Sequence, residues 1–212
     1  MSADAYQHYS APAGPGRPLL FVFHGTGGDE HQLLSMAETV LPGAGIVAPR
    51  GDVSEQGAAR FFRRTGEGVY DMDDLARATE KMSGFVNAHV AAQKPSAVLG
   101  LGYSNGANIL ATVIFADPAL FEAAVLMHPL IPFQPRIGAG TFKARLLLTA
   151  GRNDPISPST LTDRLMAYLG AAAPGSEIMW HEGGHEVRPE ELTEARRFLA
   201  PYAEKAGPEA GE

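Results

Sequence analysis

Short runs in which nearly every residue is apolar recur along the chain, separated by longer amphipathic segments. Such runs are typical of parallel strands that are buried on both faces, whereas half-exposed strands alternate apolar and polar residues. The runs lie at 19–23, 45–49, 97–101, 123–127 and 145–150, and a last strand is expected at 177–180. The pattern therefore predicts the core of a parallel sheet.

Apolar residues at helical spacing fill the segments between these runs. Helices are expected at about 31–40, 71–93, 105–115, 158–169 and 190–202. Asp71 and Asp74 stand where the second of these helices begins, in the pattern of an N-terminal cap. Because strands and helices alternate, we expect an α/β fold with a mostly parallel sheet of six or seven strands, helices on both faces and no large lid domain.

The length of 212 residues favours one domain, which we place at 18–206. Residues 1–17 are polar and rich in glycine and proline, so we expect an N-terminal arm that contains at most a short edge strand. We expect residues 207–212 to form a disordered tail.

Charge and composition narrow the class of protein. Seventeen basic residues against 24 acidic ones give a net charge of −7, which argues against a nucleic-acid partner. The chain has no cysteine, which excludes a disulfide scaffold, a thiolate zinc site and a cysteine nucleophile, and which fits a reducing compartment. No apolar stretch approaches the ~20 residues that a membrane span requires, so we expect a cytoplasmic protein.

The most informative stretch is Gly102-Tyr103-Ser104-Asn105-Gly106, which follows an apolar run and opens a helical segment. Strand, sharp turn and helix in this order are typical of a nucleophile elbow, which presents a serine above the edge of a sheet. The two glycines have a physical role there, because the strand and the helix approach too closely for side chains beside the serine. The motif predicts that Ser104 is a nucleophile.

Two later residues supply the partners that a serine nucleophile needs. Asp154 follows the strand at 145–150, and His185 follows the last strand in a glycine-rich loop. A serine hydroxyl requires a base within hydrogen-bond reach, and the base requires a third group that orients it. We therefore predict a catalytic triad of Ser104, His185 and Asp154, in which His185 is the general base.

Backbone N–H groups are the candidates for stabilising an oxyanion. The segment 24–30 is a glycine-rich loop directly after an apolar strand, and no lysine stands at the spacing of a phosphate-binding loop. We predict that the N–H groups of Thr26 and Asn105 form an oxyanion hole, the latter at a helix N-terminus.

Further residues near the strand ends are candidates for substrate binding. The long connection 51–70 is a candidate functional loop because connections of this length are uncommon in compact domains. It contains Phe61 and Phe62, expected to pack beneath the loop. The candidate substrate-binding residues are His24, Gly25, Arg63, Arg64, Tyr103 and His128, of which His128 is more simply a structural residue near the site.

The sequence allows three other hypotheses. His181 and His185 match His-Glu-x-x-His, a zinc-protease motif, but that motif requires a helix and this one has two central glycines. Gly100 and Gly102 resemble a dinucleotide-binding turn, although Asn105 stands where its third glycine belongs. The chain could also be a non-catalytic binding protein on the same fold, for which an intact triad would be superfluous.

In these motifs the chain resembles the α/β-hydrolase superfamily, and within it the phospholipase/carboxylesterase family that includes acyl-protein thioesterases. It is most similar to small bacterial carboxylesterases linked to quinone or hydroquinone tolerance. Dienelactone hydrolases share the fold, but they use a cysteine nucleophile, which this chain lacks. The segments that carry the resemblance are 23–30, 50–52, 60–64, 102–108, 151–155 and 184–185.

The resemblance spans about residues 18–200 and implies an esterase without cofactor or metal, which acts on a small-molecule ester and forms a homodimer. A thioester or a lysophospholipid is the alternative substrate, because the same triad serves all three.

Overall fold

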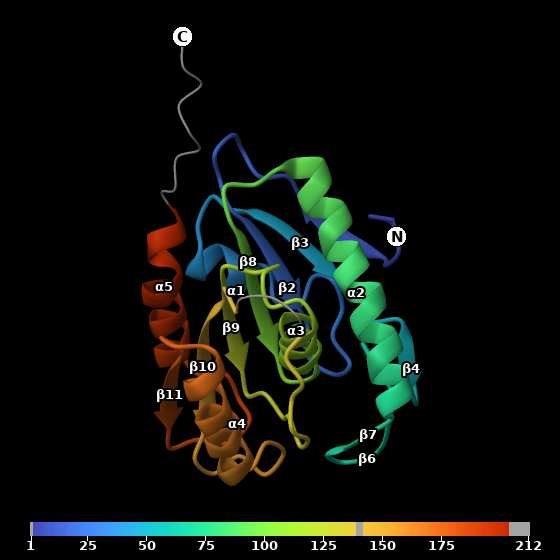
Figure 1. The fold of residues 1–212 in the computed structure, drawn as a ribbon, viewed down its shortest axis with the longest axis vertical. Helices are drawn as coiled ribbons and strands as arrows, with labels where there is room; N and C mark the ends of the chain where they lie inside the picture. Colours follow the sequence, from blue (N-terminus) through green and yellow to red (C-terminus); the bar gives the residue numbers. More distant parts are fainter. Residues whose placement is uncertain (1, 139–141, 204–212) are drawn as a thin grey trace.

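Seven strands form the central sheet of the computed structural model, which describes residues 2–138 and 142–203. Their order is β1-β3-β2-β8-β9-β10-β11, and all are parallel except β1, which pairs antiparallel with β3 (Figure 1). The strands are β1 (His8–Ala11), β2 (Leu19–Phe23), β3 (Gly45–Pro49), β8 (Val98–Tyr103), β9 (Ala123–Met127), β10 (Arg145–Gly151) and β11 (Glu177–His181).

Five helices cover the two faces of the sheet, as the alternating pattern predicts. They are α1 (Leu34–Val40), α2 (Met72–Gln93), α3 (Asn105–Ala116), α4 (Ser159–Ala172) and α5 (Pro189–Ala203). Residues of α2, α3 and α4 share one hydrophobic cluster, and residues of α1 and α5 share the other. In Figure 1, α2, α3 and α4 lie in front of the sheet.

Strand β2 shows why the apolar runs are continuous. All five of its residues are buried; Leu19, Phe21 and Phe23 belong to one cluster and Leu20 and Val22 to the other. Full burial of a large apolar side chain stabilises the fold by ~2 kcal/mol relative to its exposure. A charged residue at any position of β2 would therefore face a hydrophobic layer.

The predicted helix at 31–40 is shorter than expected, since α1 begins at Leu34. Residues 31–33 form turns, and the side chain of Asp29 accepts the N–H of His31. The cap of α2 agrees with the prediction, because the carboxylate of Asp71 accepts the N–H of Asp74.

The connection 51–70 folds into two small hairpins rather than an open loop. These are β4 (Val53–Glu55) with β5 (Ala58–Arg60), and β6 (Arg64–Gly66) with β7 (Val69–Tyr70). Gln56 and Gly57 both have positive φ angles, as tight two-residue hairpin turns require. Phe61 and Phe62 are fully buried between the hairpins, as expected for residues that pack beneath this segment.

The topology places a switch point between β2 and β8. The chain leaves β2 toward β3 on one side and later returns to β8 on the other, so connections diverge at the carboxyl ends of these two strands. Open α/β sheets bind ligands at such switch points. In Figure 1 the arrowheads of β2, β8 and β9 point to the lower edge, where the β6–β7 hairpin also lies.

Two expectations concern the ends of the chain and membranes. The tail expected at 207–212 lies outside the described residues. Among the residues that the structure describes, no helix is both long and apolar enough to cross a bilayer.

Candidate active site

Ser104 occupies a strained turn between β8 and α3. Its φ is 52° and its ψ is −117°, a combination that few non-glycine residues adopt. A side chain at Gly106 would collide with the carbonyl oxygen of Phe23, and one at Gly102 would collide with the backbone of α3. The glycines therefore allow β2, β8 and α3 to meet closely enough to hold Ser104 at the edge of the sheet.

A continuous chain of hydrogen bonds joins the three residues of the predicted triad. Nε2 of His185 lies 2.8 Å from Oγ of Ser104, and Nδ1 of His185 lies 2.7 Å from Oδ2 of Asp154. These residues are 81 and 31 positions apart along the chain. With Nδ1 donating to the carboxylate, Nε2 of a neutral ring is free to accept the proton of Ser104.

Asp154 is a buried carboxylate with four partners. Its Oδ1 accepts the N–H groups of Ile156 and Ser157 at 2.8 and 2.9 Å, and its Oδ2 faces His185 and His128. Burial by itself would raise the pKa of Asp154, but the hydrogen bonds from Ser157 and His185 outweigh it and hold the pKa below its ordinary value. The group therefore remains ionised at neutral pH.

The backbone groups expected to bind an oxyanion lie beside the serine. Thr26 and Asn105 line the same cavity as Ser104, and Asn105 is the first residue of α3. Their side chains are engaged elsewhere: Oγ1 of Thr26 accepts from Arg60 at 2.6 Å, and Oδ1 of Asn105 accepts the N–H of Phe61 at 2.9 Å. The positive end of the α3 dipole favours negative charge at this position.

A cavity of about 270 Å³ opens onto Ser104 and His185. Of the candidate substrate-binding residues, Arg64 and Tyr103 line it. Tyr103 also donates its hydroxyl to the carbonyl oxygen of His185 at 2.9 Å. The lining residues are Thr26, Arg60, Arg64, Glu67, Tyr70, Tyr103, Ser104, Asn105, Asn108, Leu130, Ile156, Ser157 and His185.

Other candidates lie outside this lining. His24 is buried, accepts the N–H of Gly51 at Nε2 and donates from Nδ1 to the carbonyl of Gly25, so both of its nitrogens are occupied. Gly25 packs against the ring of Tyr103. Arg63 points to Asp71 and Asp74 at the start of α2.

His128 is fully buried behind Asp154. It lies outside the cavity lining, in keeping with the interpretation that it is a structural residue near the site.

Five polar residues of the cavity were not singled out from the sequence as site residues: Arg60, Glu67, Tyr70, Asn108 and Ser157. Asn108 donates to the hydroxyl of Tyr70 at 2.9 Å, and that hydroxyl donates to the carbonyl of Leu130 at 2.6 Å. Oδ1 of Asn108 accepts the N–H of Leu130, which ties the cavity wall to α3. A polar Asn one turn after the serine, on a mostly apolar helix, was the available signal for Asn108.

The zinc-protease reading fails on secondary structure. His181 ends β11 and His185 lies in the loop beyond it, so the two histidines do not share a helical face. Among residues 2–138 and 142–203, no cluster of potential metal ligands contains both of them.

A mostly parallel sheet with helices on both faces and a serine on a strand–helix elbow defines an α/β-hydrolase. The profile of the dienelactone hydrolase family matches residues 9–206, nearly the whole chain. The chain belongs to the dienelactone hydrolase family. The lack of a cysteine, which argued for a weaker resemblance to this family, does not exclude membership.

Individual relatives agree with this assignment. "Putative hydrolase MhqD" of Bacillus subtilis (strain 168) is 34% identical over 182 residues, which are 85% of this chain and 91% of the relative. The structure of Atu2452 from Agrobacterium tumefaciens str. C58 is 54% identical, with a TM-score of 0.89 over 95% of this chain and 99% of that one. A carboxylesterase from Bacillus cereus is 32% identical, with a TM-score of 0.84 over 93% and 94% of the two chains. The protein is thus a hydrolase of the dienelactone hydrolase and carboxylesterase type.

Proposed function

We propose that this protein is a serine carboxylesterase that cleaves small carboxylic esters through an acyl-enzyme on Ser104. The observation that carries the proposal is the hydrogen-bond chain from Ser104 through His185 to Asp154, with distances of 2.8 and 2.7 Å, at the mouth of the polar cavity. The similarity to a bacterial carboxylesterase supports an ester substrate.

The chemistry follows from this arrangement. Oγ of Ser104 attacks the ester carbonyl carbon while Nε2 of His185 takes its proton, and the carbonyl oxygen becomes an oxyanion. The N–H groups of Thr26 and Asn105 hold that oxyanion, and one such donor is worth ~3 kcal/mol of transition-state stabilisation. His185 then protonates the leaving alcohol, and water hydrolyses the acyl-enzyme by the reverse sequence of proton transfers.

The size and polarity of the cavity favour a small substrate. A volume of about 270 Å³, lined mainly by charged, amide and hydroxyl side chains with Leu130 and Ile156 as the aliphatic ones, leaves little room for a long acyl chain. We expect p-nitrophenyl acetate and butyrate to be turned over with a much higher kcat/KM than the octanoate or laurate. A matched series of acyl thioesters, assayed in parallel, separates esterase from thioesterase. Absence of turnover across both series would contradict the proposal.

Replacing Asp154 with asparagine should lower kcat by about 10⁴-fold. The amide can present its NH₂ group to His185, which favours the ring tautomer that cannot accept the serine proton. The measurement is kcat for p-nitrophenyl acetate, with Asp163→Asn on the exposed side of α4 as the control. A larger loss in Asp163→Asn than in Asp154→Asn would mean that a different acid orients the base.

Arg64 is proposed to attract substrates that carry a negative charge, because it lines the cavity, where its guanidinium also pairs with Glu55 at 2.9 Å and with Glu67 at 2.6 Å. Arg64→Gln should raise KM for an ester with a free carboxylate by about fivefold, the equivalent of ~1 kcal/mol, and should change KM for a neutral ester less. Arg63→Gln is the matched control, since Arg63 also pairs with two carboxylates, Asp71 and Asp74, but lies outside the cavity lining. Equal changes for both esters would reduce Arg64 to ordinary surface charge.

A further inference from the structure

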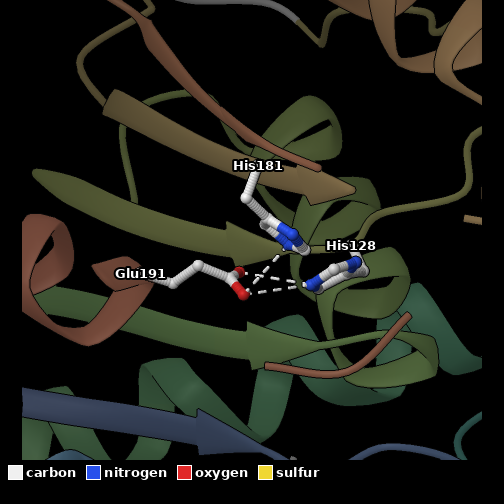
Figure 2. Close-up of side chains that lie close together, drawn as sticks. All are labelled: His128, His181 and Glu191. Carbon is white, nitrogen blue, oxygen red and sulfur yellow. Dashed lines mark hydrogen bonds and ion pairs between the residues drawn. The ribbon is translucent and has the colours of Figure 1, made fainter. Parts of the chain in front are cut away.

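Three buried side chains form a cluster beside Asp154. His128 follows β9, His181 ends β11, and Glu191 stands in the first turn of α5. Figure 2 shows both imidazole rings pointing to the carboxylate of Glu191. All three are at most 6% exposed, and none lines the cavity. Burying a carboxylate and two histidines costs free energy unless they are paired with one another. The positions of the ring protons decide how they pair.

In the ring of His181, Nε2 is the nitrogen that carries a proton. Its Nδ1 accepts the N–H of Gly183 at 3.0 Å, which leaves Nε2 to hold the proton. That nitrogen lies 3.2 Å from Oε1 of Glu191, a contact without the alignment of a full hydrogen bond. In this tautomer Nε2 turns its proton, not a lone pair, toward Glu191.

The ring of His128 lies between two carboxylates. Nδ1 is 3.1 Å from Oδ2 of Asp154, and Nε2 is 3.2 Å from Oε2 of Glu191. An ionised carboxylate only accepts hydrogen bonds, so a neutral ring would turn a lone pair toward one of the two. Two ring protons satisfy both contacts, and the ring then carries a positive charge.

The surrounding charges agree with this protonation state. Burial alone would lower the pKa of His128, but its contacts with Glu191 and Asp154 outweigh burial and raise the pKa. Burial would also raise the pKa of Glu191, yet the hydrogen bonds from His128 and Thr149 lower it overall. The titratable groups that face His128 are Asp154 from the loop after β10, Glu191 from α5, His181 from β11, His185 from the loop after β11 and Tyr103 from β8.

The backbone at His128 is held in an unfavourable conformation. Its φ is 50°, in the left-handed region that non-glycine residues rarely occupy. Its N–H donates to the carbonyl of Thr149 at 2.8 Å, and its carbonyl accepts from Oγ of Ser157 at 3.1 Å. The other described non-glycine residues with positive φ are Ser104, Gln56 in a hairpin turn and Lys94 at the end of α2. Among the described residues, positive φ at a non-glycine residue outside hairpin turns and helix C-termini is thus confined to Ser104 and His128.

We propose that His128 is a positively charged positioning residue, held in place by Glu191. It shares Oδ2 of Asp154 with His185 and keeps the ring of His185 neutral in the resting enzyme. The inference rests on the proposed function of Ser104, Asp154 and His185. The rings of His128 and His185 are 5.2 Å apart. A fixed positive charge at that distance opposes protonation of His185, so the base remains neutral and active to lower pH.

Two substitutions remove the charge while leaving a donor for Asp154. In His128→Asn the amide nitrogen can replace Nδ1, and asparagine tolerates a positive φ. In Glu191→Gln the amide nitrogen can donate to Nε2 of His128, so the ring needs only the proton on Nδ1. His181→Gln is the matched control, because it alters the same buried cluster without touching Asp154.

The measurement is the pH dependence of kcat/KM for a short p-nitrophenyl ester, which reports the free enzyme. In His128→Asn and in Glu191→Gln the acid limb should move to higher pH by about half a unit or more, since His185 protonates more readily. The double variant should shift no further than the larger single shift, because Glu191→Gln acts by discharging the same ring that His128→Asn removes. The acid limb of His181→Gln should coincide with that of the wild type. An unmoved acid limb in both variants, or shifts that add, would overturn the proposal.

Nuclear magnetic resonance of the ¹⁵N-histidine-labelled protein provides a readout that does not depend on turnover. In the wild type and in Ser104→Ala, both nitrogens of His128 should be protonated at pH 7, and only one should be in Glu191→Gln. If Ser104→Ala abolishes turnover but His128 is neutral in the wild type, the inference about His128 is contradicted and the proposed function is not. Turnover that survives Ser104→Ala contradicts the proposed function, while the resonances still report the charge of His128.

Discussion

Replacing Ser104 with alanine should abolish ester turnover, with a loss of about 10⁶-fold in kcat, and should leave the fold intact. The loss is this large because the substitution removes the only atom that forms the acyl-enzyme. The side chain is partly exposed and its removal creates no cavity in the core. The measurement is kcat for p-nitrophenyl acetate, together with circular dichroism and the thermal midpoint.

A covalent probe provides the control for this prediction. A fluorophosphonate should label the wild type at Ser104 alone and should not label Ser104→Ala. Ser35→Ala, which makes the same change on the exposed side of α1, should be labelled and should turn over substrate as the wild type does. Labelling at another serine would assign the nucleophile elsewhere.

The second large effect is expected at His185. His185→Ala should lower kcat by about 10⁶-fold, because without a base within 2.8 Å of its hydroxyl Ser104 is not activated. His31→Ala is the matched control, since His31 is exposed on a turn before α1. Turnover by the wild type should also survive a strong chelator.

Loss of turnover with a chelator would instead support the hypothesis of a zinc enzyme. Stoichiometric zinc in the purified protein, with turnover lost on chelation and regained with added metal, would mean that His185 binds a metal rather than a proton. In that case His181→Ala and His185→Ala should be equally inactive. On the esterase reading His181→Ala should affect stability, since His181 ends β11 beside Glu191.

The sheet and most of its helices were predictable because their patterns are local. Burial on both faces leaves a continuous apolar run, as in β2, and an amphipathic helix leaves an apolar stripe, as in α2. The hairpins within 51–70 were not predictable from the same rules. Their strands are two or three residues long, too short for a period, and the turn at Gln56 places a non-glycine residue at positive φ.

The sequence also does not determine which of two neighbouring residues faces the cavity. Arg63 and Arg64 are adjacent and chemically identical, yet Arg64 lines the cavity while Arg63 points to Asp71 and Asp74 at the start of α2. Which of the two faces the cavity depends on where the β6–β7 hairpin begins.

Glu191 shows the same limit for buried charge. The helix dipole ordinarily explains an acidic residue in the first turn of an amphipathic helix, and the sequence gives no further reason for this one. In the fold Glu191 is fully buried beside His128 after β9, Thr149 of β10 and His181 of β11.

The elbow around Ser104, the order of serine, acid and histidine, and the parallel sheet all follow from residues close together in the chain, because strand, turn and helix preferences act over a few positions. Three other features depend on loops that pack across the strand ends. These are the convergence of Ser104, Asp154 and His185, the position of Arg64 rather than Arg63 at the cavity, and the burial of His128 between two carboxylates. Contacts between residues 26 to 81 positions apart come from the packing of the whole sheet. No local pattern encodes them.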